Sequence, residues 1–104
     1  RVIQADLAKP MLDIPANFVD MVIIGNILHE ISHTDSLIKN VYRILKSPGR
    51  IMAVEWKKTA TPFGPPLDKR LDQQKLEVLL MQVGFRKIKD LYTDGYHYAV
   101  LFEK

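Results

Sequence analysis

A short apolar run at residues 21–24 is the feature that most constrains how this chain can fold. Gly25 and Asn26 break the run, and a cluster of polar residues follows as far as His33. A nearly continuous apolar run bounded by a breaker is typical of a strand that is buried on both faces of a parallel sheet. Ligands of such sheets bind at the carboxyl ends of the strands. We therefore expect a strand over about residues 19–26 and a functional site directly after it.

Strand and helix patterns alternate along the rest of the chain. Apolar runs predict further strands at 2–5, 50–56, 87–93 and 96–102. One helix is expected from the capping residues at 32–35 to the breaker at 47–49, and a second from the N-cap Asp72 to Gly84. Asp94-Gly95 predicts a hairpin that makes the last strand antiparallel. The alternation predicts an α/β fold with right-handed crossovers between parallel strands.

Length and composition exclude several classes of protein. A chain of 104 residues forms at most one small domain, and its net charge of +3 comes from scattered Lys and Arg, so we expect no nucleic-acid partner. There is no cysteine and no apolar run near the roughly 20 residues of a membrane span, so we expect a cytoplasmic location and no membrane partner. Because a strand pattern begins at Arg1, we expect residues 1–104 to be the carboxyl-terminal part of a longer domain.

Side chains that could bind a ligand or take part in catalysis follow the predicted strands at one edge of the sheet. Carboxyl ends of parallel strands share an edge, and a hairpin turn after such a strand lies there too. The residues expected at this edge are Asp6, the segment 26–33, Trp56, the proline-rich loop 57–66, Tyr96 and His97. The turns expected at the opposite edge carry ordinary capping residues. This asymmetry predicts a ligand site at the carboxyl edge.

The pentapeptide His29-Glu30-Ile31-Ser32-His33 also matches the H-E-x-x-H pattern of zinc metalloproteases. On one continuous helix both imidazoles would bind zinc and Glu30 would be the general base. A zinc metalloprotease is therefore an alternative function. The breaker Gly25-Asn26 and the cap signal inside the motif disfavour the long helix that it needs, so we expect no metal.

Three stretches resemble class I S-adenosylmethionine-dependent methyltransferases, and in particular the small-molecule branch that includes ubiquinone and menaquinone biosynthesis enzymes. They are Phe18-Val19-Asp20-Met21-Val22, Ile27-Leu28-His29-Glu30-Ile31, and the segment 41–51 with Arg43-Ile44-Leu45-Lys46-Ser47-Pro48-Gly49. Val83-Gly84-Phe85 and Tyr96-His97-Tyr98 are similar to the end of the last helix and to the last strand of such enzymes. The likeness extends over nearly the whole chain.

This resemblance implies a partial Rossmann-like fold with S-adenosylmethionine as cofactor. The family's sheet order is 3-2-1-4-5-7-6, and the strands of this chain would be the third to the seventh. Asp6 would accept a hydrogen bond from the adenine amino group, with Leu7 beside the ring. Gly25, Asn26 and Ile27 would lie against the methionine part.

The methyl acceptor would be a small molecule. Methyl transfer mainly requires positioning, and it requires a base if the acceptor must lose a proton. His29, His33 or His97 could be that base, and His29 is the catalytic candidate. Trp56, Tyr96 and His97 are the candidate residues for binding the acceptor.

The sequence departs from this family at its beginning. The glycine-rich loop after the family's first strand, which provides close backbone contact with the cofactor, is absent. We therefore expect the chain alone to bind S-adenosylmethionine weakly or not at all. Without the family's first and second strands, the strand near residues 20–26 would have an exposed apolar edge, which predicts a possible homodimer through that edge. A non-catalytic binding or assembly module is the third function that we consider.

Overall fold

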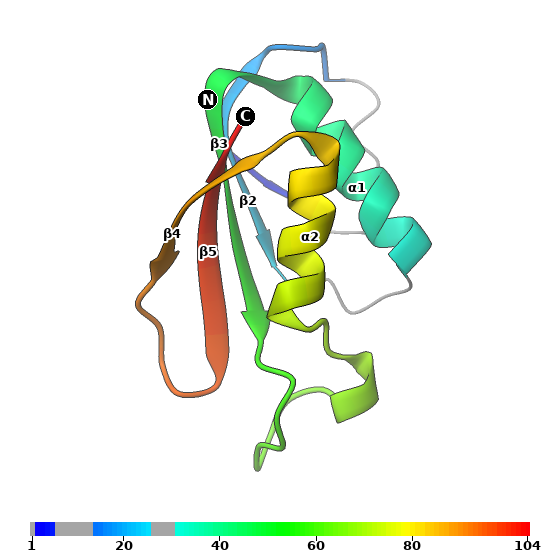
Figure 1. Cartoon of the computed structure of the whole chain (residues 1–104), viewed down its shortest axis with the longest axis vertical. Helices are drawn as coiled ribbons and strands as arrows, with labels where there is room; N and C mark the ends of the chain where they lie inside the picture. The colour runs from blue at the N-terminus through cyan, green and yellow to red at the C-terminus, as the bar shows by residue number, and fades with distance from the viewer. Residues whose placement is uncertain (1, 6–13, 26–30) are drawn as a thin grey trace.

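The computed structural model describes residues 2–5, 14–25 and 31–104. They form a mixed five-stranded sheet in the order β1-β2-β3-β5-β4, with two helices on one of its faces (Figure 1). The strands are β1 (Val2–Ala5), β2 (Val19–Gly25), β3 (Leu45–Trp56), β4 (Arg86–Leu91) and β5 (His97–Glu103). The helices are α1 (Ile31–Ile44), α2 (Gln73–Val83) and the short 3-10 helix η1 (Leu67–Lys69). The predicted α/β class is confirmed.

The pairing of the strands follows the predicted alternation. β1 pairs with β2, and β2 with β3, in parallel, while β5 runs antiparallel to both β3 and β4. Helix α1 connects the parallel strands β2 and β3, as expected for a crossover connection. The carboxyl ends of β1, β2 and β3 therefore lie at one edge of the sheet, together with the start of β5.

The strands follow the order that the resemblance implied for the third to the seventh strand, 3-4-5-7-6, but one pairing differs. In the order 3-2-1-4-5-7-6, two strands would separate β1 from β2, but here Ala5 lies directly opposite Ile24. The physical reason is that an unpaired strand edge exposes backbone N–H and C=O groups, and β1 satisfies those of β2. β2 is paired on both sides, so the exposed edge that the homodimer prediction required is not present. That prediction is wrong in its stated form.

Three boundaries differ from the sequence prediction. β3 begins at Leu45 instead of Arg50, because Leu45 leaves the helical stripe and pairs with Val19 of β2. Helix α1 begins at Ile31, before the predicted capping residues, so Thr34 is a buried helical residue. The connection between β4 and β5 is five residues long, 92–96, and is not a two-residue hairpin.

The hydrophobic core lies between the sheet and the two helices. Helix α1 contributes Leu37, Ile38, Val41 and Ile44, and α2 contributes Leu76 and Leu80, packed on buried residues of β2, β3 and β5. Gly84 ends α2 with φ 125°, and Phe85 is buried after it, as predicted. Phe85 meets Tyr42 of α1 edge to face, with ring centroids 5.1 Å apart. In the described ranges, neither helix has the length and apolar character needed to cross a membrane.

Candidate functional site

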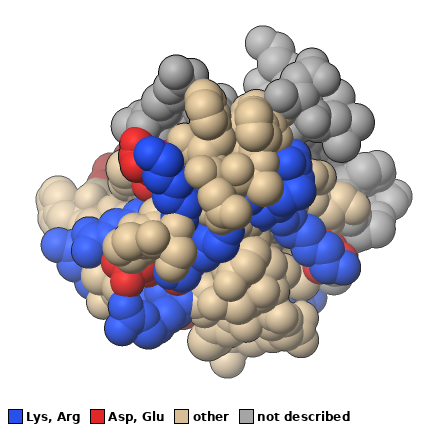
Figure 2. Space-filling view, turned by 90° about the horizontal axis from the view of Figure 1, so that it is seen from above, with Lys and Arg blue, Asp and Glu red and all other residues tan. Residues whose placement is uncertain are grey.

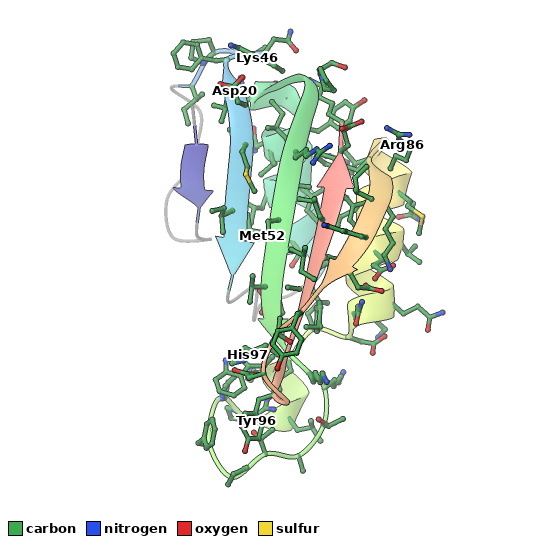
Figure 3. The ribbon with its side chains drawn as sticks, turned by 90° about the vertical axis from the view of Figure 1, so that its left-hand side faces the viewer. Asp20, Lys46, Met52, Arg86, Tyr96 and His97 are labelled. Atoms are coloured by element: carbon green, nitrogen blue, oxygen red, sulfur yellow. The ribbon has the colours of Figure 1, made fainter. Side chains whose placement is uncertain are left out.

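The described carboxyl edge of the sheet brings together residues that are far apart in the sequence. Gly25, at the end of β2, lies opposite Val54, and Trp56, at the end of β3, lies opposite His97 of β5. Figure 3 shows Tyr96 and His97 at this end of the sheet, with Asp20, Lys46 and Arg86 at the other end. The remaining predicted site residues lie outside the described residues; they are Asp6, Leu7, Asn26, Ile27 and His29.

Four rings pack together at this edge, and we refer to Trp56, Phe63, Tyr96 and His97 as the aromatic corner. The Trp56 ring lies 4.2 Å from His97 and 5.7 Å from Phe63, measured between centroids. Phe63 meets Tyr96 edge to face at 4.8 Å. The backbone N–H of Lys57 donates to the Tyr96 carbonyl oxygen at 2.8 Å, which ties the β4–β5 connection to the end of β3. The aromatic corner thus joins segments that follow β3 and precede β5.

Arg70 holds the loop of residues 57–66 in place, although the sequence analysis gave it no role. Its side chain is buried, and the guanidinium carbon lies 5.1 Å from the Trp56 ring centroid. Its three nitrogens donate hydrogen bonds of 2.7–3.2 Å to loop oxygens of Lys57, Thr59, Thr61, Phe63 and Pro65. Five acceptors around one planar cation define the path of the loop. No pattern in the sequence distinguishes this arginine from a surface arginine.

Gly64 completes the packing of this loop on Trp56. Its φ of 97° is in the region that favours glycine, and a Cβ there would lie 2.9 Å from two atoms of the indole ring. The loop backbone can therefore approach the indole only because position 64 has no side chain. The loop 57–66, which was expected to contribute to the site, carries Phe63 to the aromatic corner.

The exposure of the rings separates packing residues from available ones. The indole of Trp56 contacts His97, Phe63 and Arg70, and it is the centre of the cluster. Phe63 is 52% exposed and Tyr96 is 37% exposed. Trp56 and Tyr96 were both predicted to bind the acceptor; Trp56 is partly buried, and Phe63, which was not among the predicted residues, is the most exposed of the four rings.

His97 has a carboxylate partner in the preceding turn. Its Nδ1 lies 2.9 Å and 3.0 Å from the two carboxylate oxygens of Asp94. Oδ1 of Asp94 also accepts hydrogen bonds from the backbone N–H groups of Tyr96 and His97 at 2.8 Å and 3.0 Å. The hydrogen bond to the His97 side chain, followed by that from the Tyr96 backbone, lowers the pKa of Asp94. Asp94 therefore shapes the turn and orients the imidazole.

A buried polar pair lies beneath the aromatic corner, on the core side of the sheet. Glu55 and Tyr98 face each other across β3 and β5, and both are buried. The Tyr98 hydroxyl donates to the carbonyl oxygen of Leu71 at 2.9 Å. Burial, with a smaller effect of the Glu55 charge, raises the pKa of Tyr98 above its usual value. This tyrosine stays protonated and anchors the segment before α2.

Gly25 is the one predicted cofactor-binding residue that lies within the described part of the chain. A Cβ at this residue would lie 3.2 Å from the carbonyl oxygen of Val54, so the neighbouring strand limits the size of the residue here. A residue without a side chain also leaves the backbone at the end of β2 open to close approach. The position is thus compatible with a ligand lying against the end of β2.

The zinc alternative finds no support in the described part of the chain. His29 and Glu30 lie outside the described residues, and helix α1 begins at Ile31. Among the residues that the structure describes, no three His, Asp or Glu side chains are grouped so that they could hold a metal ion.

The amino edge of the sheet is highly charged. Figure 2 looks onto this edge and shows Lys and Arg side chains spread over it. Lys46 pairs with Asp20 at 3.5 Å, and Arg50 and Arg86 both pair with Glu103. These cations are half or more exposed and have carboxylate partners, as expected for a solvated surface. The contrast with the aromatic carboxyl edge agrees with the predicted asymmetry.

Comparison with known proteins identifies the family. The sequence profile of the family described as "Methyltransferase domain" matches residues 1–53, just over half of the chain. The chain therefore belongs to the class I S-adenosylmethionine-dependent methyltransferases, as the resemblance indicated. The cofactor of that family is S-adenosylmethionine.

Individual relatives support this assignment. The chain is 30% identical over 87 residues to the ubiquinone/menaquinone biosynthesis C-methyltransferase UbiE of Serratia proteamaculans (strain 568), covering 84% of this chain and 32% of that protein. A solved structure of a type 11 methyltransferase candidate from Sulfolobus solfataricus has 30% identity and a TM-score of 0.78, covering 89% of this chain and 54% of that one.

A SAM dependent methyltransferase from Aquifex aeolicus has the same fold, with a TM-score of 0.78 at 22% identity. It is matched over 88% of this chain and 48% of its own length. The chain thus spans between a third and about half of the relatives named here.

Proposed function

We propose that residues 1–104 are the carboxyl-terminal part of a methyltransferase domain that transfers a methyl group from S-adenosylmethionine to a small-molecule acceptor. The observation that carries the proposal is that the end of β2 and the aromatic corner of β3 and β5 lie at the same edge of the sheet. In a parallel sheet this edge is where ligands bind. Membership of the methyltransferase family supplies the reaction class.

The cofactor would bind along the ends of β1 and β2. Asp6 and Leu7 follow β1 and would hold the adenine, while Gly25, Asn26 and Ile27 at the end of β2 would lie against the methionine part. The bound cofactor would supply a methyl group on a sulfonium centre, which an acceptor atom can attack directly. Among the described residues, the position of Gly25 supports this: it is the last residue of β2 and lies beside β3.

The acceptor would bind next to β3 and β5, where the rings are. Tyr96 and Phe63 offer exposed aromatic surface, with Trp56 behind them and His97 beside it. The named relative UbiE is a C-methyltransferase of quinone biosynthesis, which favours a small molecule over a macromolecule as acceptor. His29, after the end of β2, is our candidate catalytic residue. A cytoplasmic location also stays a prediction.

Binding of the cofactor tests this proposal directly. The experiment is titration calorimetry with S-adenosylmethionine on the full-length protein that contains the chain, and on residues 1–104 alone. We expect saturable binding by the full-length protein, and weak or no binding by the chain alone, because the glycine-rich loop is absent from it. No binding by the full-length protein would refute the proposed function. Tight binding by residues 1–104 would refute the expectation that binding requires the glycine-rich loop.

A further inference from the structure

The sequence named His97 as a candidate for binding the acceptor and as one of three possible bases, and its pairing with Asp94 adds a partner that orients the ring. An imidazole nitrogen whose hydrogen is donated to a carboxylate leaves the other nitrogen as the acceptor. In this chain Nδ1 is the engaged nitrogen, at 2.9 Å and 3.0 Å from the two oxygens of Asp94. The His97 side chain is 26% exposed, so the ring is partly open at the carboxyl edge.

The surroundings of His97 fix the position of its ring. The indole of Trp56 lies against the imidazole, with centroids 4.2 Å apart and planes inclined by 43°. The hydroxyl of Thr93 donates to the His97 carbonyl oxygen at 2.6 Å, which closes the turn. Among the described residues, Asp94 on the same turn contacts the ring, and Arg70 lies over the neighbouring Trp56 ring. A ring held by a carboxylate and by a packed indole is oriented before a ligand arrives.

We propose that His97 is a general base of the methyl transfer and that Asp94 is its positioning residue, so that Nε2 accepts the proton of a phenolic or enolic hydroxyl on the acceptor. This inference rests on the proposed function. It names the acceptor class, because a base is needed when the acceptor carries a proton that it must lose. The exposed rings of Phe63 and Tyr96 suit a flat, unsaturated molecule of that class.

The proposed step balances in atoms and charge. The O–H bond of the acceptor breaks and its proton goes to Nε2 of His97, while an oxygen lone pair forms the bond to the methyl carbon. The bond between that carbon and the sulfonium sulfur breaks, and its electron pair stays on sulfur. The products are the methylated acceptor, S-adenosylhomocysteine and a protonated His97, which releases its proton to water. Asp94 stabilises the imidazolium throughout without accepting the proton.

The tautomer of His97 tests the geometry without any need for methyl transfer. The chain has three histidines, so long-range ¹H–¹⁵N NMR of ring-labelled protein can resolve them, and loss of signals in His97→Gln assigns the one of interest. We expect neutral His97 to carry its hydrogen on Nδ1. In Asp94→Asn the amide nitrogen can turn toward Nδ1 and reverse the tautomer. The exposed Asp68→Asn is the matched control and should change nothing. A wild-type Nε2–H tautomer, or one that Asp94→Asn leaves unaltered, would overturn the proposal.

Kinetics on the full-length protein test the role in catalysis, with hydroquinone as the phenolic probe. We expect His97→Gln and Asp94→Asn each to lower kcat about 100-fold at pH 7, with little change in KM. The loss should shrink as the pH rises toward about 10, where a phenol ionises by itself. Wild-type kcat in both variants, or a loss independent of pH, would overturn the role of His97. A wild type that binds the cofactor but leaves hydroquinone unmethylated would overturn the acceptor class, whereas absent cofactor binding would refute the proposed function and leave the tautomer result standing.

Discussion

Replacing Arg70 by alanine should release the loop of residues 57–66 from the end of β3. Arg70 is 5% exposed, and its guanidinium donates to oxygens of five loop residues and lies over the Trp56 ring. A hydrogen bond to a charged group contributes about 1.5–3 kcal/mol to stability. The loop is largely exposed, so its freed carbonyl groups regain water and these contributions do not add. We expect a loss in the free energy of unfolding of about 3 kcal/mol, the value of one or two such bonds.

This loss corresponds to a large change in melting temperature. For a domain of this size, 1 kcal/mol shifts the midpoint by about 4–8 °C, so Arg70→Ala should melt about 12–24 °C below the wild type. Arg70→Lys keeps the charge but not the planar set of donors, and it should lose about half as much. A melting temperature that falls in the order wild type, Arg70→Lys, Arg70→Ala would therefore show that the guanidinium geometry holds the loop.

Trp56 reports on the loop separately from global unfolding. It is the sole tryptophan of the chain, and both Arg70 and Gly64 lie against it. We expect Arg70→Ala to shift its fluorescence emission under native conditions, and Gly64→Ala to do the same while every donor of Arg70 is present. Urea titration and calorimetry give the free energies. Native-state emission that is unchanged in both variants, together with an Arg70→Ala loss below about 0.5 kcal/mol, would refute the reasoning.

Three further predictions concern single residues. Tyr98→Phe removes the hydroxyl that donates to Leu71, and should cost about 1–2 kcal/mol in urea titration; an unchanged midpoint would contradict this. The pKa of Glu103 is held below 4.5, first by Arg86, so its stabilising contribution is present above pH 4.5 and disappears as the pH falls through the lowered pKa. The difference in urea midpoint between wild type and Glu103→Gln should therefore be smaller at pH 3 than at pH 7, and an equal difference would contradict the ion pair. Phe63→Ala should cost only about 1 kcal/mol in stability, because Phe63 is 52% exposed although its ring contacts Trp56 and Tyr96, yet it should raise KM for hydroquinone in the full-length protein; an unaltered KM would remove Phe63 from the acceptor site.

The elements that local sequence patterns determine were predicted well. β2 was predicted from its apolar run, and α2 from Asp72, its apolar face and the Gly84-Phe85 ending, because each signal lies within the element itself. The resemblance gave the order of the strands correctly, but the direct pairing of β1 with β2 was not predicted. Which strand lies beside β2 depends on which backbone edges are left unpaired, and no local pattern encodes that.

The sequence indicated the location of the site but not its supporting contacts. Strand alternation was enough to place Trp56 and His97 at one edge, because the rule for carboxyl ends needs only the direction of each strand. Arg70 was missed because its five acceptors are mainly carbonyl oxygens of a loop whose path depends on the arginine itself. The partner role of Asp94 was missed because a spacing of three residues acquires meaning only once the turn has formed.

The most direct test of the account is to find where the cofactor product binds. The measurement is the change in backbone and indole NMR signals of the full-length protein on titration with S-adenosylhomocysteine, which cannot react. We expect changes at Gly25 and Trp56, on the carboxyl edge, and none at Lys46 or Arg86, on the amino edge. Changes confined to Lys46, Arg86 and their neighbours would contradict it.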